Sequence, residues 1–189
     1  MPSLPFTLPR IFARAAFKPP PQARGINTLF SGITGGSSNA ALVNSMAASG
    51  WLFGCVDRIA SAVAAVEWQL FDGDKELEKH PLLDLWRKPH PHLTGFAFRE
   101  IGAQHFELTG ETWWAIVKGP LGPELWPLRP DRVRVVPDAE DFIKGYVYSI
   151  GGQDMPLDAK DVLSIMRPNP ADIYRGIGVV ESAMVEIET

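Results

Sequence analysis

The sequence has a single cysteine, Cys55, among its 189 residues. One thiol can form neither a disulfide within the chain nor a zinc site built from several cysteines. This fits a reducing, intracellular setting. Long apolar runs are absent as well, because stretches such as 59–66 are far shorter than the roughly 20 residues that a membrane-spanning helix needs. We therefore expect no membrane span.

Acidic residues are absent from the first 56 positions, where four basic residues lie. The remaining positions hold 14 basic and 22 acidic residues, so the net charge of −4 conceals an arm of +4 and a body of −8. A body of that charge is a poor general DNA binder. An acidic surface would, however, suit a channel along which DNA slides without sticking.

Residues 1–44 are rich first in proline and then in glycine and serine, and they show no sustained apolar period. We interpret them as an extended basic arm. A binding module imported by a mitochondrial transit peptide is an alternative, but the prolines at 19–21 oppose the amphipathic helix that such a peptide needs. Residues 45–177 show regular periods, which predict an α+β domain with helices packed on a small mixed or antiparallel sheet.

Helices are predicted where apolar residues recur with a period of 3.6. A short helix is expected over 80–86, and a longer one runs from a Thr94 cap to Gly110. Another is expected to start near Gly178 and to continue to the last residue without a C-cap. The helix nearest the N-terminus is expected to begin near Ser45 and to bury a stripe made of Leu52, Val56, Ile59, Ala60 and Val63.

Short strands are predicted between and after these helices. Segment 112–117 is apolar on both faces, which is typical of a strand at the centre of a sheet. Pro127 lacks an amide donor and places segment 124–128 at an edge. Arg132 and Arg134 are expected to share one solvated strand face. The predicted strands comprise residues 66–70, 112–117, 124–128, 132–136, 146–150 and 161–166.

Four side chains come nearest to a metal-binding set: His80, Asp84, His90 and His92. Imidazole and carboxylate groups are good ligands for zinc or iron. They leave open the alternative of a small α+β metal-dependent hydrolase. The spacing disfavours it, because His90 and His92 flank Pro91 in a proline-locked loop with no matching downstream pair. Exposed loop histidines are the simpler interpretation.

Other reactive side chains give no catalytic pattern. Cys55 has no histidine near it in the sequence, and we expect it to be a small packed hydrophobe. No serine lies in a Gly-x-Ser-x-Gly elbow. Asp138, Glu140 and Asp141 are expected to be solvated in a hairpin loop. The sequence therefore predicts no catalytic, cofactor-binding or metal-binding residue.

Seven short segments follow one another along the chain in an order that is hard to reproduce by chance. They are residues 55–60, 68–71, 80–83, 110–113, 128–133, 161–165 and 172–176. This order resembles the portal proteins of tailed bacteriophages, specifically the HK97-like portal family, from about Trp51 to the last residue. The similarity lies in the order of weak signals, since no single motif is strong.

Several positions depart from the family pattern. His90 replaces a usual asparagine, and Ser164 stands where a histidine is frequent. Residues 178–180 read Gly-Val-Val instead of the common Ser-Pro-Leu, so the last helix lacks the proline expected in its first turn. None of these changes touches chemistry, because the family is not enzymatic.

The resemblance implies a structural subunit rather than an enzyme, without cofactors. Identical subunits would form a homo-oligomeric ring, usually a dodecamer, at one vertex of the capsid. Within such a subunit, residues 45–177 would belong to the wing, and residues 178–189 would begin a helix that leads toward the stem. The chain would then be the first part of a longer subunit.

The resemblance also implies a set of partners. Double-stranded DNA would pass through the channel without sequence specificity during packaging and ejection. The terminase would dock on the ring, a head–tail adaptor would join it later, and the major capsid protein would surround it. The subunit would assemble in the host cytoplasm and remain in the virion at the portal vertex.

Overall fold

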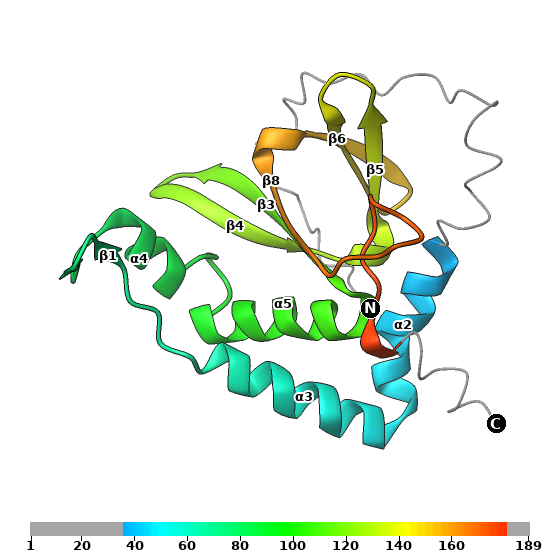
Figure 1. The fold of residues 1–189 in the computed structure, drawn as a ribbon, viewed down its shortest axis with the longest axis horizontal. Helices are drawn as coiled ribbons and strands as arrows, with labels where there is room; N and C mark the ends of the chain where they lie inside the picture. Colours follow the sequence, from blue (N-terminus) through cyan, green and yellow to red (C-terminus); the bar gives the residue numbers. More distant parts are fainter. Residues whose placement is uncertain (1–35, 181–189) are drawn as a thin grey trace, which may run out of the picture.

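The structure is a computed structural model that describes residues 36–180 (Figure 1). Most of the predicted arm and most of the predicted last helix lie outside these residues. Within them, four α-helices accompany one two-stranded and two three-stranded antiparallel sheets. The predicted α+β class is thus confirmed. No helix within the described range has the length and hydropathy needed to cross a bilayer.

The chain is helical earlier than the sequence predicted. Helix α2 spans Gly36–Ala48, so the extended interpretation of residues 36–44 is wrong. Its alanines and small polar residues give no clear apolar period, and tertiary contacts stabilise it instead, because Leu42 is buried against Val56. Ser49 then interrupts the helix with extended backbone angles, and its hydroxyl accepts a hydrogen bond from the Leu52 amide.

Helix α3 spans Gly50–Ala64 and buries a narrower stripe than predicted. Val56, Ala60 and Ala64 are buried, whereas Ile59 and Val63 are about half exposed. The small alanines allow a close approach to α5, so only the residues directly over the contact lose solvent. The placement of Ile59 and Val63 in the core stripe was therefore wrong.

The strand predicted over 66–70 is absent. This segment has no regular secondary structure, and both Val66 and Trp68 are exposed. A short hairpin follows instead, formed by β1 (Phe71–Asp72) and β2 (Lys75–Glu76). Gly73 adopts a positive φ in the turn between them, as expected where only glycine is unstrained. Apart from the Leu70 carbonyl, which accepts the Leu77 amide at 2.8 Å, residues 66–70 form no strand pairing, so the alternating pattern did not produce a strand.

The next two helices follow the prediction closely. Helix α4 spans Pro81–Arg87 and is capped by the His80 side chain. Helix α5 spans Gly95–Thr109, with Thr94 as its N-cap and Gly110 in the left-handed region as its C-cap. Residues 179 and 180 are helical, which agrees with a last helix starting near 178.

One three-stranded sheet has the order β4-β3-β8. Its strands are β3 (Glu111–Gly119), β4 (Gly122–Leu128) and β8 (Val162–Met166). The central position of β3 and the edge position of β4 are both confirmed. Figure 1 shows α5 between this sheet and α3, so that α3 forms the outermost layer on that side.

The other three-stranded sheet has the order β5-β6-β7. Its strands are β5 (Val133–Asp138), β6 (Phe142–Ile150) and β7 (Gln153–Asp158). Strand β7 was not predicted, because its sequence lacks a clean alternation. Arg132 belongs to the 3-10 turn Pro130–Arg132 and does not share a strand face with Arg134, so that prediction was wrong.

The two three-stranded sheets share one apolar core. Trp113 is fully buried in it and meets the Tyr146 ring edge-to-face, with 5.3 Å between ring centroids. Val133 and Val162 belong to the same cluster. A large aromatic side chain on the central strand therefore fixes how the two sheets pack.

Candidate functional site

The structure does not gather the four metal-ligand candidates into one site. His80 uses Nδ1 to accept the Leu82 amide, and Asp84 forms an exposed ion pair with Arg87. His90 uses Nδ1 to accept the His92 amide. Within residues 36–180, no group of three histidine, cysteine or acidic side chains could hold a metal ion. The hydrolase alternative thus finds no support in the geometry.

The three loop histidines differ in exposure. His92 is exposed as expected, but His80 is half-buried and His90 is buried against the Trp126 ring. Burial, assisted by the nearby His92, lowers the pKa of His90, while Glu124 opposes the shift. The expectation that all were exposed loop residues was wrong for His90, which packs edge-on against an aromatic ring, and only partly correct for His80, which caps α4.

The structure tests the predictions made for the acidic loop and for Cys55. The acidic loop joins β5 to β6 as expected, and Asp138 accepts the amides of Glu140 and Asp141, which lower its pKa. Cys55 is exposed on α3 and is not a packed hydrophobe. It lies on the apolar outer side of a helix whose opposite side packs on α5.

A buried carboxylate and guanidinium form the strongest polar cluster. Glu111, the first residue of β3, is completely buried, and Arg175 forms an ion pair with it. Asn39 donates to Glu111 Oε1 at 3.0 Å, and the Gly176 amide donates to Oε2 at 3.1 Å. We name this cluster of Asn39, Glu111, Arg175 and Gly176 the Glu111–Arg175 junction.

Arg175 extends the junction to the start of β5. Its Nη1 donates to the Val133 carbonyl at 2.6 Å, and its Nη2 donates to the Pro130 carbonyl at 3.1 Å. Burial raises the pKa of Glu111, while Arg175 and the Gly176 amide oppose the rise. A carboxylate with three donors and no exposed surface offers no access to a substrate. Its role is to fix three segments to one another.

Close backbone contacts complete the junction. Gly110 has a φ of +73°, and a Cβ added there would overlap the Ile177 carbonyl group. The Arg167 amide donates to the Gly110 carbonyl at 2.7 Å. The segment 167–178 therefore lies directly on the corner between α5 and β3. It leads from this corner into the helical residues 179 and 180.

The junction joins three of the segments that resemble the family pattern: 110–113, 128–133 and 172–176. Their contact was not predicted, because Glu111 and Arg175 are 64 positions apart and show no local spacing pattern. One signal was available. Glu111 is a carboxylate at the start of a strand that is apolar on both faces, so it needs a buried cationic partner.

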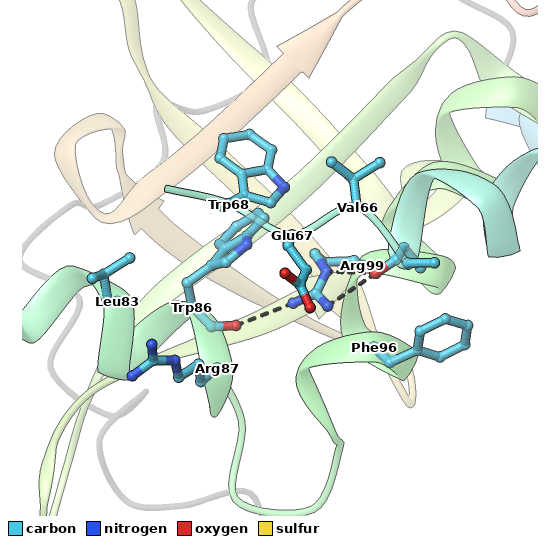
Figure 2. Close-up of a pocket in the computed structure, with 10 residues that line it drawn as sticks. Val66, Glu67, Trp68, Leu83, Trp86, Arg87, Phe96 and Arg99 are labelled. Carbon is cyan, nitrogen blue, oxygen red and sulfur yellow. Dashed lines mark hydrogen bonds between the residues drawn. The ribbon is translucent and has the colours of Figure 1, made fainter. Parts of the chain in front are cut away.

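A surface pocket opens at the C-terminal end of α3 (Figure 2). The guanidinium of Arg99 is its central polar group, but all three nitrogens are already bonded to protein. Nε and Nη2 donate to the Ala64 carbonyl at 3.0 and 2.9 Å, and Nη1 donates to the Trp86 carbonyl at 3.3 Å. Arg99 thus caps the end of α3 and is not poised to bind an anion.

Comparisons with known proteins identify the family. A sequence profile described as "Phage portal protein" matches residues 51–189. The chain belongs to the phage portal protein family. The family expected from the order of the sequence motifs is thus confirmed. The matched range contains α3 from its second residue onward and both charged partners of the Glu111–Arg175 junction.

Solved structures with the same fold come from gene transfer agent (GTA) particles. One is a chain in the neck of an empty GTA particle, computed with C6 symmetry, which is 28% identical and has a TM-score of 0.75. The alignment covers 80% of the present chain and 43% of the GTA chain. A chain in a native GTA virion is 27% identical, with a TM-score of 0.68 and coverages of 80% and 41%. A chain in a native neck computed with C12 symmetry is 26% identical, with the same score and coverages.

The portal chain therefore spans less than half of the length of these matched chains. Comparison with curated proteins finds no significant match.

One partly buried titratable group of the chain gives a pH prediction. Burial lowers the pKa of His105, on α5, to about 4, assisted by Arg129 and opposed by Asp131. The folded chain therefore keeps this imidazole neutral above pH 4, whereas the unfolded chain protonates it near 6.5. The contribution of neutral His105 to the free energy of unfolding is fully present above pH 6.5 and is lost as the pH falls toward 4.

We expect the wild-type free energy of unfolding to fall by about 2–3 kcal/mol more than that of His105→Gln between pH 7.5 and pH 4.5. Urea unfolding at both pH values measures this, and each variant is compared with its own value at pH 7.5. The pKa shifts of Glu111 and Asp138 are present in both proteins, so their contributions to the pH dependence cancel in the comparison. Equal losses in the two proteins would contradict a neutral, partly buried imidazole.

Proposed function

We propose that the chain supplies the wing part of a portal subunit, a structural component of a homo-oligomeric ring at one vertex of a phage or phage-like capsid. The observation that carries this proposal is the family match over residues 51–189. The similar chains in particle necks support it, because one of these necks was computed with C12 symmetry. A dodecamer is the corresponding ring.

The proposal assigns each part of the chain to a region of the portal subunit. Residues 45–177 would form the wing, and residues 178–189 would begin the helix toward the stem. The Glu111–Arg175 junction supports such a transition, because it anchors segment 167–178 immediately before that helix. Residues 1–44 would be a basic segment that precedes the wing, with α2 at its end.

The proposed partners are those of a packaging channel. Double-stranded DNA would pass through the ring without sequence specificity, and the net charge of −8 after residue 56 would limit its adhesion to the wall. The terminase, a head–tail adaptor and the major capsid protein would contact the ring from outside. The subunit would assemble in the host cytoplasm and remain in the virion. No catalytic role is part of the proposal.

The mass of the full-length gene product in solution tests the proposal. We expect a discrete species of about twelve subunit masses, because closed rings have a fixed subunit number. Mass photometry at several protein concentrations gives this number directly. A species that stays at one subunit mass at every concentration would refute the assignment.

A further inference from the structure

Helix α3 exposes an apolar face, which Arg58 borders one turn from Cys55 and Ala62. The face consists of Trp51, Cys55, Ile59, Ala62 and Val63, and we name it the outer face of α3. Trp51 is 89% exposed, and all the other members are exposed as well. Positions 51, 55, 59 and 63 are four residues apart, so they follow one side of the helix. A tryptophan exposed to this degree is costly in water.

The other side of α3 is also apolar, because Val56, Ala60 and Ala64 pack on α5. The only charged residues of the helix are Asp57 and Arg58. A helix that is apolar nearly all round is typical of one covered on two sides. In Figure 1, α3 is instead the outermost layer. Part of its cover is therefore missing from the described residues.

The apolar surface continues past the end of α3. Val66, Trp68 and Phe96 line the pocket in Figure 2 and are between 43% and 61% exposed. Arg99 keeps its guanidinium on backbone carbonyls there, so it does not add an available charge to this surface. Glu67 and Arg87, both exposed, line the same pocket, so the apolar patch over the helix and its end has a charged rim here. An exposed apolar patch with a polar rim marks an interaction site.

The ends of the described range lie on the inner side of α3. Val180, where the description stops, packs with Leu42, Val56 and Leu108, on the side of α3 that faces α5. Near the start of α2, Asn39 donates a hydrogen bond to Glu111, the first residue of β3, which follows α5 directly. The chain thus enters and leaves this range on the side opposite the outer face. These positions favour an occupant that comes from another molecule.

We propose that the outer face of α3 is an interface on which a second copy of this chain packs in the ring. The proposal rests on the proposed function, because a ring gives each subunit a neighbour in a fixed orientation. Ring contacts are heterologous, so the face meets a different surface of the neighbour. Permanent assemblies use apolar interfaces of this kind, whereas transient contacts are more polar.

Cys55 is a natural probe of this interface, because it lies in the middle of the outer face and is exposed in the single chain. Rings and dissociated subunits of the full-length product are treated with a maleimide, and labelling of the Cys55 peptide is followed by mass spectrometry. We expect labelling to be at least tenfold slower in the ring. The control is Leu121→Cys in a Cys55→Ser background, since Leu121 is 100% exposed in a turn and should label equally in both states.

Equal labelling of Cys55 in rings and subunits would overturn the proposal. Protection that persists in folded, dissociated subunits would overturn it as well, because it would show that another segment of the same chain covers the face. Both outcomes leave the proposed function intact, since rings are present in the experiment. Failure of the wild-type product to form rings would count against the proposed function itself.

Ile59→Arg gives an independent test. Ile59 is 45% exposed, so arginine can extend into solvent and the isolated subunit should keep its melting temperature and circular dichroism. A charge inside an apolar interface should lower the fraction of protein in rings at least tenfold. Leu121→Arg is the matched control and should assemble like the wild type. Normal ring formation by Ile59→Arg would refute the interface.

Discussion

Replacing Arg175 with alanine is expected to lower the free energy of unfolding by about 3–5 kcal/mol, because it leaves the Glu111 carboxylate buried without its cation. The same change removes the donors to the Val133 and Pro130 carbonyls. The loss should appear in urea unfolding at pH 7.5 as a lower midpoint with an unchanged slope.

Arg134→Ala is the matched control for Arg175→Ala. Arg134 forms an ion pair with Asp154 at 3.2 Å, but both side chains are about half exposed. Exposed pairs of this kind contribute at most about 1 kcal/mol. A similar loss in both variants would contradict the view that burial, and not the presence of an ion pair, makes the junction important.

Gly110→Ala is expected to destabilise the fold by at least about 2 kcal/mol, since alanine is strained in the left-handed region and its Cβ would overlap the Ile177 carbonyl. The overlap should also displace segment 167–178. Limited trypsin digestion should then cut after Arg175 faster than in the wild type. Thermal unfolding and the digestion rate together measure both effects.

Gly54→Ala is the control for the glycine substitution. Gly54 lies inside α3, and a Cβ added there meets no heavy atom within 4 Å. Alanine should therefore stabilise the fold by about 0.5–1 kcal/mol through its higher helix propensity. A Gly110→Ala variant that lost no stability would contradict the close contact between Gly110 and segment 167–178.

Local patterns predicted the elements whose signals are local. The caps at Thr94 and Gly110 and the double apolar face of β3 depend on neighbouring residues, and all three were found as predicted. The short helix over 80–86 was recognised for the same reason. Local patterns therefore placed these elements correctly along the chain.

Elements that depend on distant partners were missed or misplaced. Helix α2 is held by contacts of Leu42 with residues far along the chain, and β7 exists because it pairs with β6. The pairing of Glu111 with Arg175 likewise joins positions 64 residues apart. Sequence periodicity depends on neighbouring residues and does not predict pairings between distant ones. The junction could therefore be identified only in the folded chain.

The prediction of which α3 side chains are buried failed for a different reason. The apolar period was read correctly, but it does not say which of two apolar sides faces the same chain. Ile59 was expected in the core stripe and Cys55 was expected to be packed, but both lie on the outer face. An apolar helix that serves two interfaces has the same sequence pattern as a core helix.

The most direct test of the central claim is electron microscopy of the full-length gene product. Class averages viewed along the symmetry axis should show a ring with a central channel, and their rotational symmetry should be twelvefold. The α+β domain described here should lie in the ring with the outer face of α3 against a neighbouring subunit. Class averages that show only single, unassembled subunits would contradict the account.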